Sequence, residues 1–379
     1  MIELKEICKV QCGFAFDSKK FTEDSSYYPL IRIRDVKRGF TQTYYTGEFS
    51  SEYIVHKGDL LVGMDGEFNI ARWNSDDALL NQRVCRIIAN NNVNEEYLRF
   101  YLKRTLKLIE SKTSFVTVKH LSTKELNGLR LNLPCMETQQ CISKQLSTLE
   151  LMIQKNKKVL ELLDELVKAR FVEMFGDPNI EFKYNSIKFN DLVVRMTKGP
   201  FGSDMKKDLF VPKGEDTYKV YIQINAIQKN QSLGEYYISK EYFDRKVSRF
   251  ELFPNDYIIT CDGTLGKYLK LDENMEKGVI SPSLLRLTLQ SDRINDKYFE
   301  NIWDFYMLGL MKKEARNACL VHLPSAKKIG EISIPLPPLE LQNQFASFVE
   351  EIDKSRSRIQ KSLEASQELF DSLMQEYFG

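Results

Sequence analysis

The sequence predicts a multidomain α/β protein in which two similar mixed α/β domains alternate with two long helices. The string at residues 133–139 returns near the end of the chain at residues 336–342, an offset of 203 residues. Each copy runs into a long amphipathic segment that closes on phenylalanine and glycine, at 175–176 and 378–379. Solenoid units are only about 20–50 residues long, so this repeat indicates a duplicated module of domain plus helix.

The two domains share four blocks in the same order, which supports the duplication. The offsets drift from 186 residues at the first block to 201 at the fourth and 203 at the repeated string, as loop insertions would produce. The matched blocks are 13–20 with 199–207, 28–35 with 218–225, 57–66 with 254–263, and 93–98 with 294–299. Short β-branched and aromatic runs predict strands, for example at 60–62, 84–88, 257–260 and 284–289. Helical spacing of apolar residues predicts helices at 95–110 and 296–313.

The two long segments carry a heptad seam, in which apolar residues recur at alternating steps of four and three. The first seam consists of Ile142, Leu146, Leu149, Ile153, Leu160, Leu163 and Val167, and the second of Phe345, Val349, Ile352, Ile359, Leu363 and Phe370. Asn156 interrupts the first seam, and Arg356 and Ser366 interrupt the second, as polar residues that fix register commonly do. Two seams in one chain most simply pair with each other. The alternative is two unrelated amphipathic helices, each on its own domain.

Composition favours a cytoplasmic protein. The formal net charge of +1 shows no global positive field, although local charge matters more for nucleic-acid binding than the total. Seven cysteines without any C-x-x-C pair argue against a disulfide framework or a structural zinc site and favour the reducing cytosol. The N-terminus does not resemble a secretory signal, and no apolar run approaches the roughly 20 residues of a membrane span.

Motifs for catalysis are missing, which favours a chain without enzymatic activity or a metal site. The string at residues 261–268 lacks the first glycine and the final hydroxyl of a phosphate-binding loop. His120 and His322 occupy matched places, and their sequence neighbours suggest a structural role near a turn or a polar contact to a ligand. The repeated Asp65-Gly66 and Asp262-Gly263 pairs first of all predict turns, with a functional role as the lesser alternative.

At this point the pattern resembles a known family, the specificity (S) subunits of type I restriction-modification systems. The resemblance covers essentially the whole chain and rests mainly on Leu133 to Gln139 and Leu336 to Gln342 with their helices. The turns at 58–62 and 255–259 and the string at 81–87 support it. The departures are local: Pro134-Cys135 stands where the second copy has two prolines, and Pro254 stands where the first domain has Lys57.

The resemblance implies the following organisation, with pseudo-two-fold symmetry. Residues 1–135 and 179–335 would be target-recognition domains, each reading one half of a bipartite DNA sequence. Residues 136–178 and 336–379 would pair as an antiparallel coiled coil that spaces the domains and docks methyltransferase subunits. Two methyltransferase subunits would hold S-adenosylmethionine and methylate adenine, and restriction subunits would use ATP and Mg, so this chain would bind no cofactor and catalyse nothing alone.

Reading bases requires forked donors and amides, and gripping phosphates requires cations, so polar residues near the predicted loops are the candidates for DNA binding. In the first domain they are Lys19, Lys20, Arg32, Arg34, Lys37, Arg38, Arg72, Lys112 and Thr113. In the second domain they are Ser203, Lys206, Lys207, Gln223, Asn225, Lys267 and Arg316. Each one could equally be a solvated surface residue, and the matched pairs Lys19/Lys206 and Lys20/Lys207 are the better candidates.

Two other classes of function stay open on the sequence alone. A structural or assembly protein would use the paired helices for oligomerisation and would show no salt-dependent affinity for DNA. A nuclease using Asp65 or Asp262 with Lys267 would cleave DNA in a metal-dependent reaction.

Overall fold

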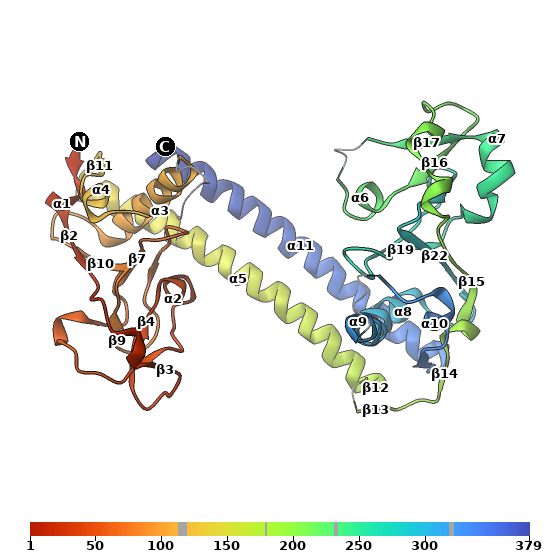
Figure 1. Ribbon diagram of the computed structural model, residues 1–379, viewed down its shortest axis with the longest axis horizontal. Helices are drawn as coiled ribbons and strands as arrows, with labels where there is room; N and C mark the ends of the chain where they lie inside the picture. Colours follow the sequence, from red (N-terminus) through yellow and green to blue (C-terminus); the bar gives the residue numbers. More distant parts are fainter. Residues whose placement is uncertain (113–119, 179, 231–233, 318–321) are drawn as a thin grey trace. The chain divides into compact units, whose positions relative to one another are not determined.

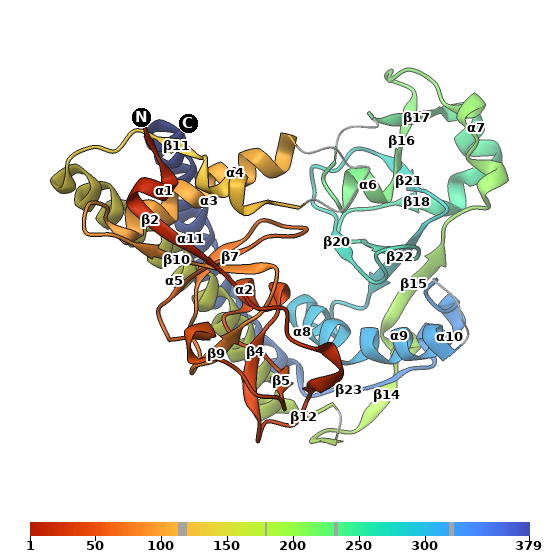
Figure 2. The same ribbon diagram turned by 60° about the vertical axis from the view of Figure 1, so that its left-hand side comes forward.

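The structure, a computed structural model, describes all residues except 113–119, 179, 231–233 and 318–321, and the helix but not the side chains at 314–317. The chain divides into two compact units: unit 1 is residues 1–159 with 359–379, and unit 2 is residues 160–358. Each unit holds one mixed α/β domain and parts of the two long helices, α5 (Met136–Phe175) and α11 (Leu339–Phe378). Figures 1 and 2 show the elements from two directions.

In the described part of the chain, the domain of unit 1 contains three sheets. An antiparallel sheet has the order β2 (Cys8–Cys12), β10 (Val84–Ala89), β7 (Leu60–Gly63), β8 (Ile70–Arg72). A second sheet has the order β3 (Phe21–Thr22), β5 (Tyr44–Tyr45), β4 (Tyr28–Ile31), β9 (Ala78–Leu80), β6 (Ile54–Val55), with β4 and β9 parallel. A short pair joins β1 (Ile2–Glu3) to β11 (Arg130–Leu131).

The domain of unit 2 repeats most of this topology, but among the described residues its second sheet has no strand that corresponds to β3. Its first sheet has the order β15 (Val193–Lys198), β22 (Leu284–Leu289), β19 (Tyr257–Thr260), β20 (Tyr268–Lys270). Its second has the order β17 (Tyr236–Ser239), β16 (Thr217–Tyr221), β21 (Gly278–Ile280), β18 (Glu251–Leu252), again with one parallel pair, β16 with β21. The short pairs are β14 (Ser186–Lys188) with β23 (Ser333–Pro335) and β12 (Gly176–Asp177) with β13 (Glu181–Phe182). The predicted duplication of a mixed α/β domain is therefore confirmed.

The helices of the two domains also correspond. Unit 1 has α1 (Leu4–Ile7), α2 (Ile33–Arg38), α3 (Glu95–Lys112) and α4 (Thr123–Asn127), with short 3-10 turns η1 (Ser18–Lys20) and η2 (Ser51–Tyr53). Unit 2 has α6 (Gln223–Ala226), α7 (Lys240–Tyr242), α8 (Asp296–Ile302), α9 (Leu308–Asn317) and α10 (Ala326–Gly330). Its 3-10 turns are η3 (Phe189–Leu192), η4 (Gly202–Asp204), η5 (Lys207–Leu209) and η7 (Ser248–Phe250). Two segments are π-helical, η6 (Phe243–Val247) after α7 and η8 (Trp303–Met307) between α8 and α9.

The matched glycines Gly13 and Gly199 lie where two backbones approach closely. A Cβ atom would lie 2.1 Å from Asn81 O at Gly13 and 2.0 Å from Ser281 O at Gly199. Only a residue without a side chain fits either position. The first predicted block therefore marks a packing constraint that both domains keep.

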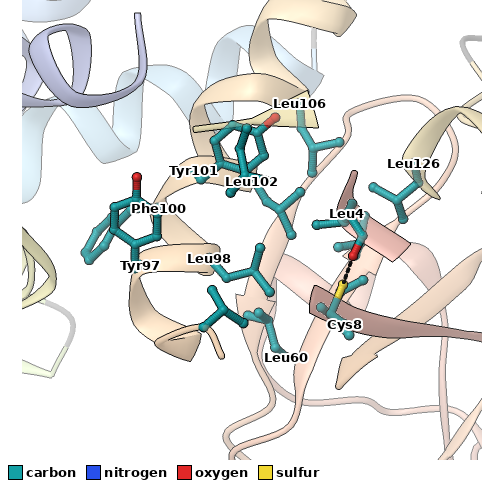
Figure 3. Packing of buried hydrophobic residues seen from close by; sticks show 14 of the residues in the cluster. Leu4, Cys8, Leu60, Tyr97, Leu98, Phe100, Tyr101, Leu102, Leu106 and Leu126 are labelled. Atoms are coloured by element: carbon teal, nitrogen blue, oxygen red, sulfur yellow. Dashed lines mark hydrogen bonds between the residues drawn. The ribbon is translucent and has the colours of Figure 1, made fainter. Parts of the chain in front are cut away.

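The core of unit 1 forms where α3 covers the antiparallel sheet and the short α1 and α4 helices. Leu98, Leu102 and Leu106 of α3 are fully buried together with Leu60 and Leu126 (Figure 3). Burying a leucine side chain contributes about 1.5–3 kcal/mol, so this face of α3 accounts for much of the stability of the domain. The apolar periodicity that predicted this helix is the periodicity of its buried face.

A buried glutamine at the start of each long helix explains why the string at 133–139 recurs at 336–342. Gln139 accepts a hydrogen bond from Asn94 N at 2.8 Å and donates one to Pro134 O at 2.8 Å. Gln342 does the same with Asn295 N at 2.8 Å and Pro337 O at 2.9 Å. Asn94 and Asn295 in turn cap α3 and α8 by accepting from backbone N–H groups. The motif thus ties each long helix to the main helix of its domain.

Replacing Gln342 with alanine should lower the free energy of unfolding of unit 2 by about 1–3 kcal/mol, because buried backbone groups lose their partner. Gln344→Ala is the matched control, since Gln344 is exposed on the same helix and carries the same side chain. Denaturant unfolding followed by the fluorescence of Trp303, which is fully buried in unit 2, measures both variants. Equal losses in the two variants would contradict this role.

The long helices α5 and α11 pack side by side and antiparallel within each unit (Figure 1). In unit 1, Gln145 Oε1 accepts from Tyr377 Oη at 3.0 Å, and Asn156 Nδ2 donates to Ser362 Oγ at 3.2 Å. In unit 2, Asp164 pairs with Arg356 at 2.6 Å, and the rings of Phe171 and Phe345 lie 5.7 Å apart.

All the predicted seam positions are buried or half-buried, including the polar interruptions at 156, 356 and 366. The prediction of a paired heptad seam is thus confirmed. No helix among the described residues combines the length and apolar character needed to cross a membrane.

Candidate nucleic-acid interface

Two elements of each domain meet at a polar surface: the short helix that follows β4 or β16 and the turn that follows β7 or β19. In unit 1, α2 approaches this turn, where Lys37 Nζ lies 3.1 Å from Glu67 Oε2. In unit 2, Gln223 of α6 donates to Thr264 Oγ1 at 2.9 Å, and Gln228 Nε2 lies 3.4 Å from the same oxygen. We call this the turn surface of each domain, and it is the candidate DNA interface.

Arg32 and Arg34, both predicted from the sequence, lie together at an open cavity of about 670 Å³ in unit 1. Asp35 caps α2 by accepting from Arg32 N at 2.9 Å, which fixes the start of the helix. The Arg34 side chain is 56% exposed and its Nε lies 3.8 Å from Asp35, too far for a hydrogen bond. The remaining lining residues, which the sequence did not single out, are Phe21, Thr22, Glu23, Gln42, Thr43 and Tyr44.

The chemistry of this cavity suits a DNA groove. Arginine guanidinium groups and the Gln42 amide are the donors that read guanine and adenine edges, and Thr43 and Tyr44 add hydroxyl groups. The corresponding residues of unit 2 are Ile222 and Ile224, so the arginine pair belongs to the first domain alone.

The matched basic pairs are exposed in both domains. Lys19 and Lys20 form η1, and Asp17 caps this turn by accepting from Lys19 N at 3.0 Å. Lys206 and Lys207 stand at the start of η5, with Ser203 exposed in the preceding turn η4. Among the described residues, none of these four lysines forms an ion pair, so their charges are available to an anion.

The other candidates of unit 1 divide into different environments. Lys37 and Arg38 are exposed on α2, and Lys112 is exposed at the end of α3. Arg72 lies apart from them, because its guanidinium contacts Glu95 at 2.9 Å and Glu96 at 2.5 Å and donates to Gly58 O at 2.7 Å. These contacts hold the Arg72 side chain against the start of α3. Thr113 lies outside the described residues.

In unit 2, Gln223 lies on the turn surface and Lys267 is exposed beyond the turn. The Asn225 amide donates to Gly234 O, while its Oδ1 is buried without a partner among the described residues. Arg316 lies in α9, and its side chain is outside the described part of the chain. Gln223 is the first residue of α6, and the sequence could not show that Thr264, 41 residues away, holds its side chain.

In each domain, the histidine contacts the aspartate of the Asp-Gly turn, although the sequence analysis treated them separately. His120 Nδ1 lies 2.5 Å from Asp65 Oδ1, and His322 Nδ1 lies 2.6 Å from Asp262 Oδ1. In unit 1, Arg83 adds a cation, with Nε 3.3 Å from Asp65 Oδ2. Both pairs sit on the turn surface, since each aspartate begins the turn after β7 or β19.

Half-buried ion pairs join the domain of unit 1 to α5. Glu150 of α5 contacts Arg99 at 2.7 Å and Lys103 at 2.5 Å, both on α3. Burial acts to raise the pKa of the Glu150 carboxyl, but hydrogen bonds and attraction from the two cations outweigh it and hold the pKa below the ordinary value. The charged carboxylate is thus the stable form, and this network ties α5 to α3.

The chain is similar to known proteins in sequence and in fold. The family model described as type I restriction modification DNA specificity domain matches the chain twice, over residues 1–165 and 202–367. The EcoBI specificity subunit of a type I restriction enzyme from Escherichia coli is 28% identical, over 96% of this chain and 81% of that protein. The MjaVIII specificity subunit from Methanocaldococcus jannaschii is 22% identical, over 90% of this chain and 84% of that protein.

Two solved structures share the fold. One is the S subunit of a type I restriction-modification system from M. genitalium, with a TM-score of 0.62, 14% identity, and coverage of 100% of this chain and 95% of that chain. The other comes from work on complex assembly and conformational transition of a type I restriction-modification system. Its TM-score is 0.53, with 14% identity and coverage of 100% and 96%.

Proposed function

The chain belongs to the family of type I restriction modification DNA specificity domains, and we propose that each of its two recognition domains reads one half of a bipartite DNA target. It is a specificity subunit of a type I restriction-modification system and does not itself catalyse a reaction. The observation that carries the proposal is the repetition of the domain, in which the matched strands of both larger sheets keep the same order, because a duplicated reader suits a target with two separated halves.

The helices supply a spacer of suitable size. α5 and α11 each contain 40 residues, which makes rods of about 60 Å at roughly 1.5 Å per residue. B-DNA advances about 34 Å per turn, so such a rod can hold two readers more than one turn apart while the bases between them go unread. The length of the helix pair would then set the spacing of the half-sites.

The partners follow from this division of labour. Two methyltransferase subunits would dock on the chain, hold S-adenosylmethionine and methylate adenine, and restriction subunits would supply ATP and Mg for translocation and cleavage. The chain itself would bind no cofactor and would act in the cytoplasm, where its DNA is. The pseudo-two-fold repeat supports two equivalent docking places, one for each methyltransferase.

Methylome sequencing tests the proposal in cells that carry the chain with its methyltransferase partner. Deleting the chain should remove methyladenine from a single bipartite motif with a fixed spacer and leave methylation at other motifs unchanged. The control is a strain with the intact chain and a catalytically inactive methyltransferase. It shows the loss of methylation that occurs while the proposed reader is still present. If the methylome stays unchanged on deletion while the methyltransferase is active, the chain is an assembly protein rather than a reader.

A further inference from the structure

The two His–Asp pairs on the turn surfaces have nearly the same contact geometry. The Nδ1 to Oδ1 distances differ by only a tenth of an ångström, at 2.5 Å and 2.6 Å. The backbone around them also repeats, because Leu121 N donates to Met64 O and Leu323 N donates to Cys261 O, both at 2.8 Å. Both domains have the His–Asp pair and the backbone hydrogen bond beside it, although only unit 1 adds an arginine, Arg83.

The fold does not need these side chains. The backbone hydrogen bonds already join the turn to the segment after the main helix, and exposed ion pairs contribute little to stability. The His120 side chain is 50% exposed and that of His322 is 58% exposed. Gly66 and Gly263, at φ of 71° and 68°, hold the turn in the left-handed conformation that aims each aspartate at its histidine. The turn is therefore built to orient an exposed imidazole.

Each imidazole presents one unused ring nitrogen. Asp65 and Asp262 occupy Nδ1, and among the described residues no partner contacts Nε2 of either histidine. A carboxylate only accepts, and it lies at Nδ1, so Nε2 is the ring nitrogen left for a further partner. In unit 1, Arg83 Nη1 also lies 3.1 Å from His120 Nδ1 and places a cation beside the ring. A ring nitrogen held in a fixed direction at an exposed position suits an anionic oxygen.

The residues that both domains share indicate which part of the DNA they contact. The two halves of an asymmetric target differ in their bases but share the phosphodiester backbone, and contacts to phosphates fix position without reading sequence. The residues that suit base reading differ between the domains, with Arg32 and Arg34 in one and Ile222 and Ile224 in the other. The His–Asp pairs do not differ.

We propose that His120 and His322 are matched DNA backbone contacts, each donating from Nε2 to a phosphate oxygen at corresponding places in the two half-sites. Asp65 and Asp262 are positioning residues that act through the histidines. This inference rests on the proposed function, since it names how that same surface grips its target.

The test measures the affinity of the full chain, in complex with its methyltransferase subunits, for two duplexes of equal length. One carries the motif found in the methylome, and the other carries a scrambled sequence. His120→Ala and His322→Ala should each weaken binding to both duplexes by about the same factor, near tenfold for a hydrogen bond to a charged group. Each should also reduce the slope of log affinity against log salt concentration by about 0.9.

His56→Ala is the matched control. His56 is also exposed and also contacts an aspartate through Nδ1, at 2.9 Å from Asp77 Oδ1, but Phe253 stands at the corresponding place in the second domain. It should leave both affinities unchanged. Circular dichroism of all three variants checks the fold, which replacement of exposed side chains should leave intact.

Three outcomes overturn the inference. Loss of affinity for the motif duplex alone would make the histidines base readers. Loss of methyltransferase assembly with unchanged DNA affinity would make them a protein contact. Affinities equal to that of His56→Ala would leave them without a role in binding. Failure of the proposed function is distinguishable, because the unaltered complex would then show no preference for the motif duplex over the scrambled one.

Discussion

Replacing Phe171 with alanine is expected to lower the free energy of unfolding of unit 2 by about 3–5 kcal/mol. Phe171 of α5 is fully buried, and its ring lies 5.1 to 5.9 Å from the rings of Phe175, Phe305, Phe345 and Tyr298. These rings come from α5, α11 and the main helical segment of the second domain. The truncation therefore opens a cavity where three elements meet, and close-packed aromatic neighbours cannot collapse to fill it.

The chain offers a way to follow this effect in one unit at a time. It contains two tryptophans, Trp73 in unit 1 and Trp303 in unit 2, which are 1% and 0% exposed. In a Trp73→Phe background, denaturant unfolding followed by fluorescence reports unit 2, and in a Trp303→Phe background it reports unit 1. Phe171→Ala should shift the Trp303 transition in the first background.

Leu162→Ala is the control for the Phe171 substitution, because Leu162 lies on the same helix but is 48% exposed. Its effect should stay within about 0.5 kcal/mol. A Phe171→Ala transition that coincides with that of Leu162→Ala would show that the aromatic cluster does not hold the helix to the domain. A shift reported equally by both tryptophans would show that the two units unfold as one.

The heptad seams could be predicted because their cause is local. A helix that pairs along one face must place apolar residues at steps of three and four, whatever its partner is. The interruptions could be located but not explained, since their partners depend on the antiparallel register. Asn156 meets Ser362, and Arg356 meets Asp164, 192 residues earlier in the chain. Only the folded pair brings these side chains together.

Part of the candidate interface could also be predicted, because it too depends on local sequence. Arg32 and Arg34 lie in one of the repeated blocks and line a cavity, so their residue type and their place in the sequence were enough to single them out. Arg72 has the same type, but Glu95 and Glu96, more than 20 residues away, engage it. The His120–Asp65 pair, 55 residues apart, was missed because each half by itself has an ordinary explanation as a turn. Long-range pairing decides which polar residues remain free.

The internal repeat separates two kinds of contact that composition alone cannot distinguish. Features kept in both domains, such as the lysine pairs and the His–Asp pairs, suit the backbone that both half-sites share. Features confined to one domain suit the bases of one half-site. The exposed arginine pair of unit 1, with an isoleucine at each matched position, is the clearest feature of the second kind.

Replacing both Arg32 and Arg34 with alanine should therefore abolish recognition of one half-site and spare the other. An arginine paired with guanine contributes about 1–3 kcal/mol of discrimination, so the double substitution should reduce the preference for the correct half-site by roughly a hundredfold or more. Binding of the full complex to duplexes with substitutions in one half of the motif measures this preference for each half separately.

Arg130→Ala is the control, because Arg130 belongs to the same domain, is 63% exposed and lies outside the cavity in β11. Removing this charge should weaken binding to all duplexes slightly or not at all. If the double substitution weakened binding to both half-sites equally, the arginines would grip phosphates rather than read bases. Equal weakening would also remove the reason for their absence from the second domain, since the two half-sites present the same backbone.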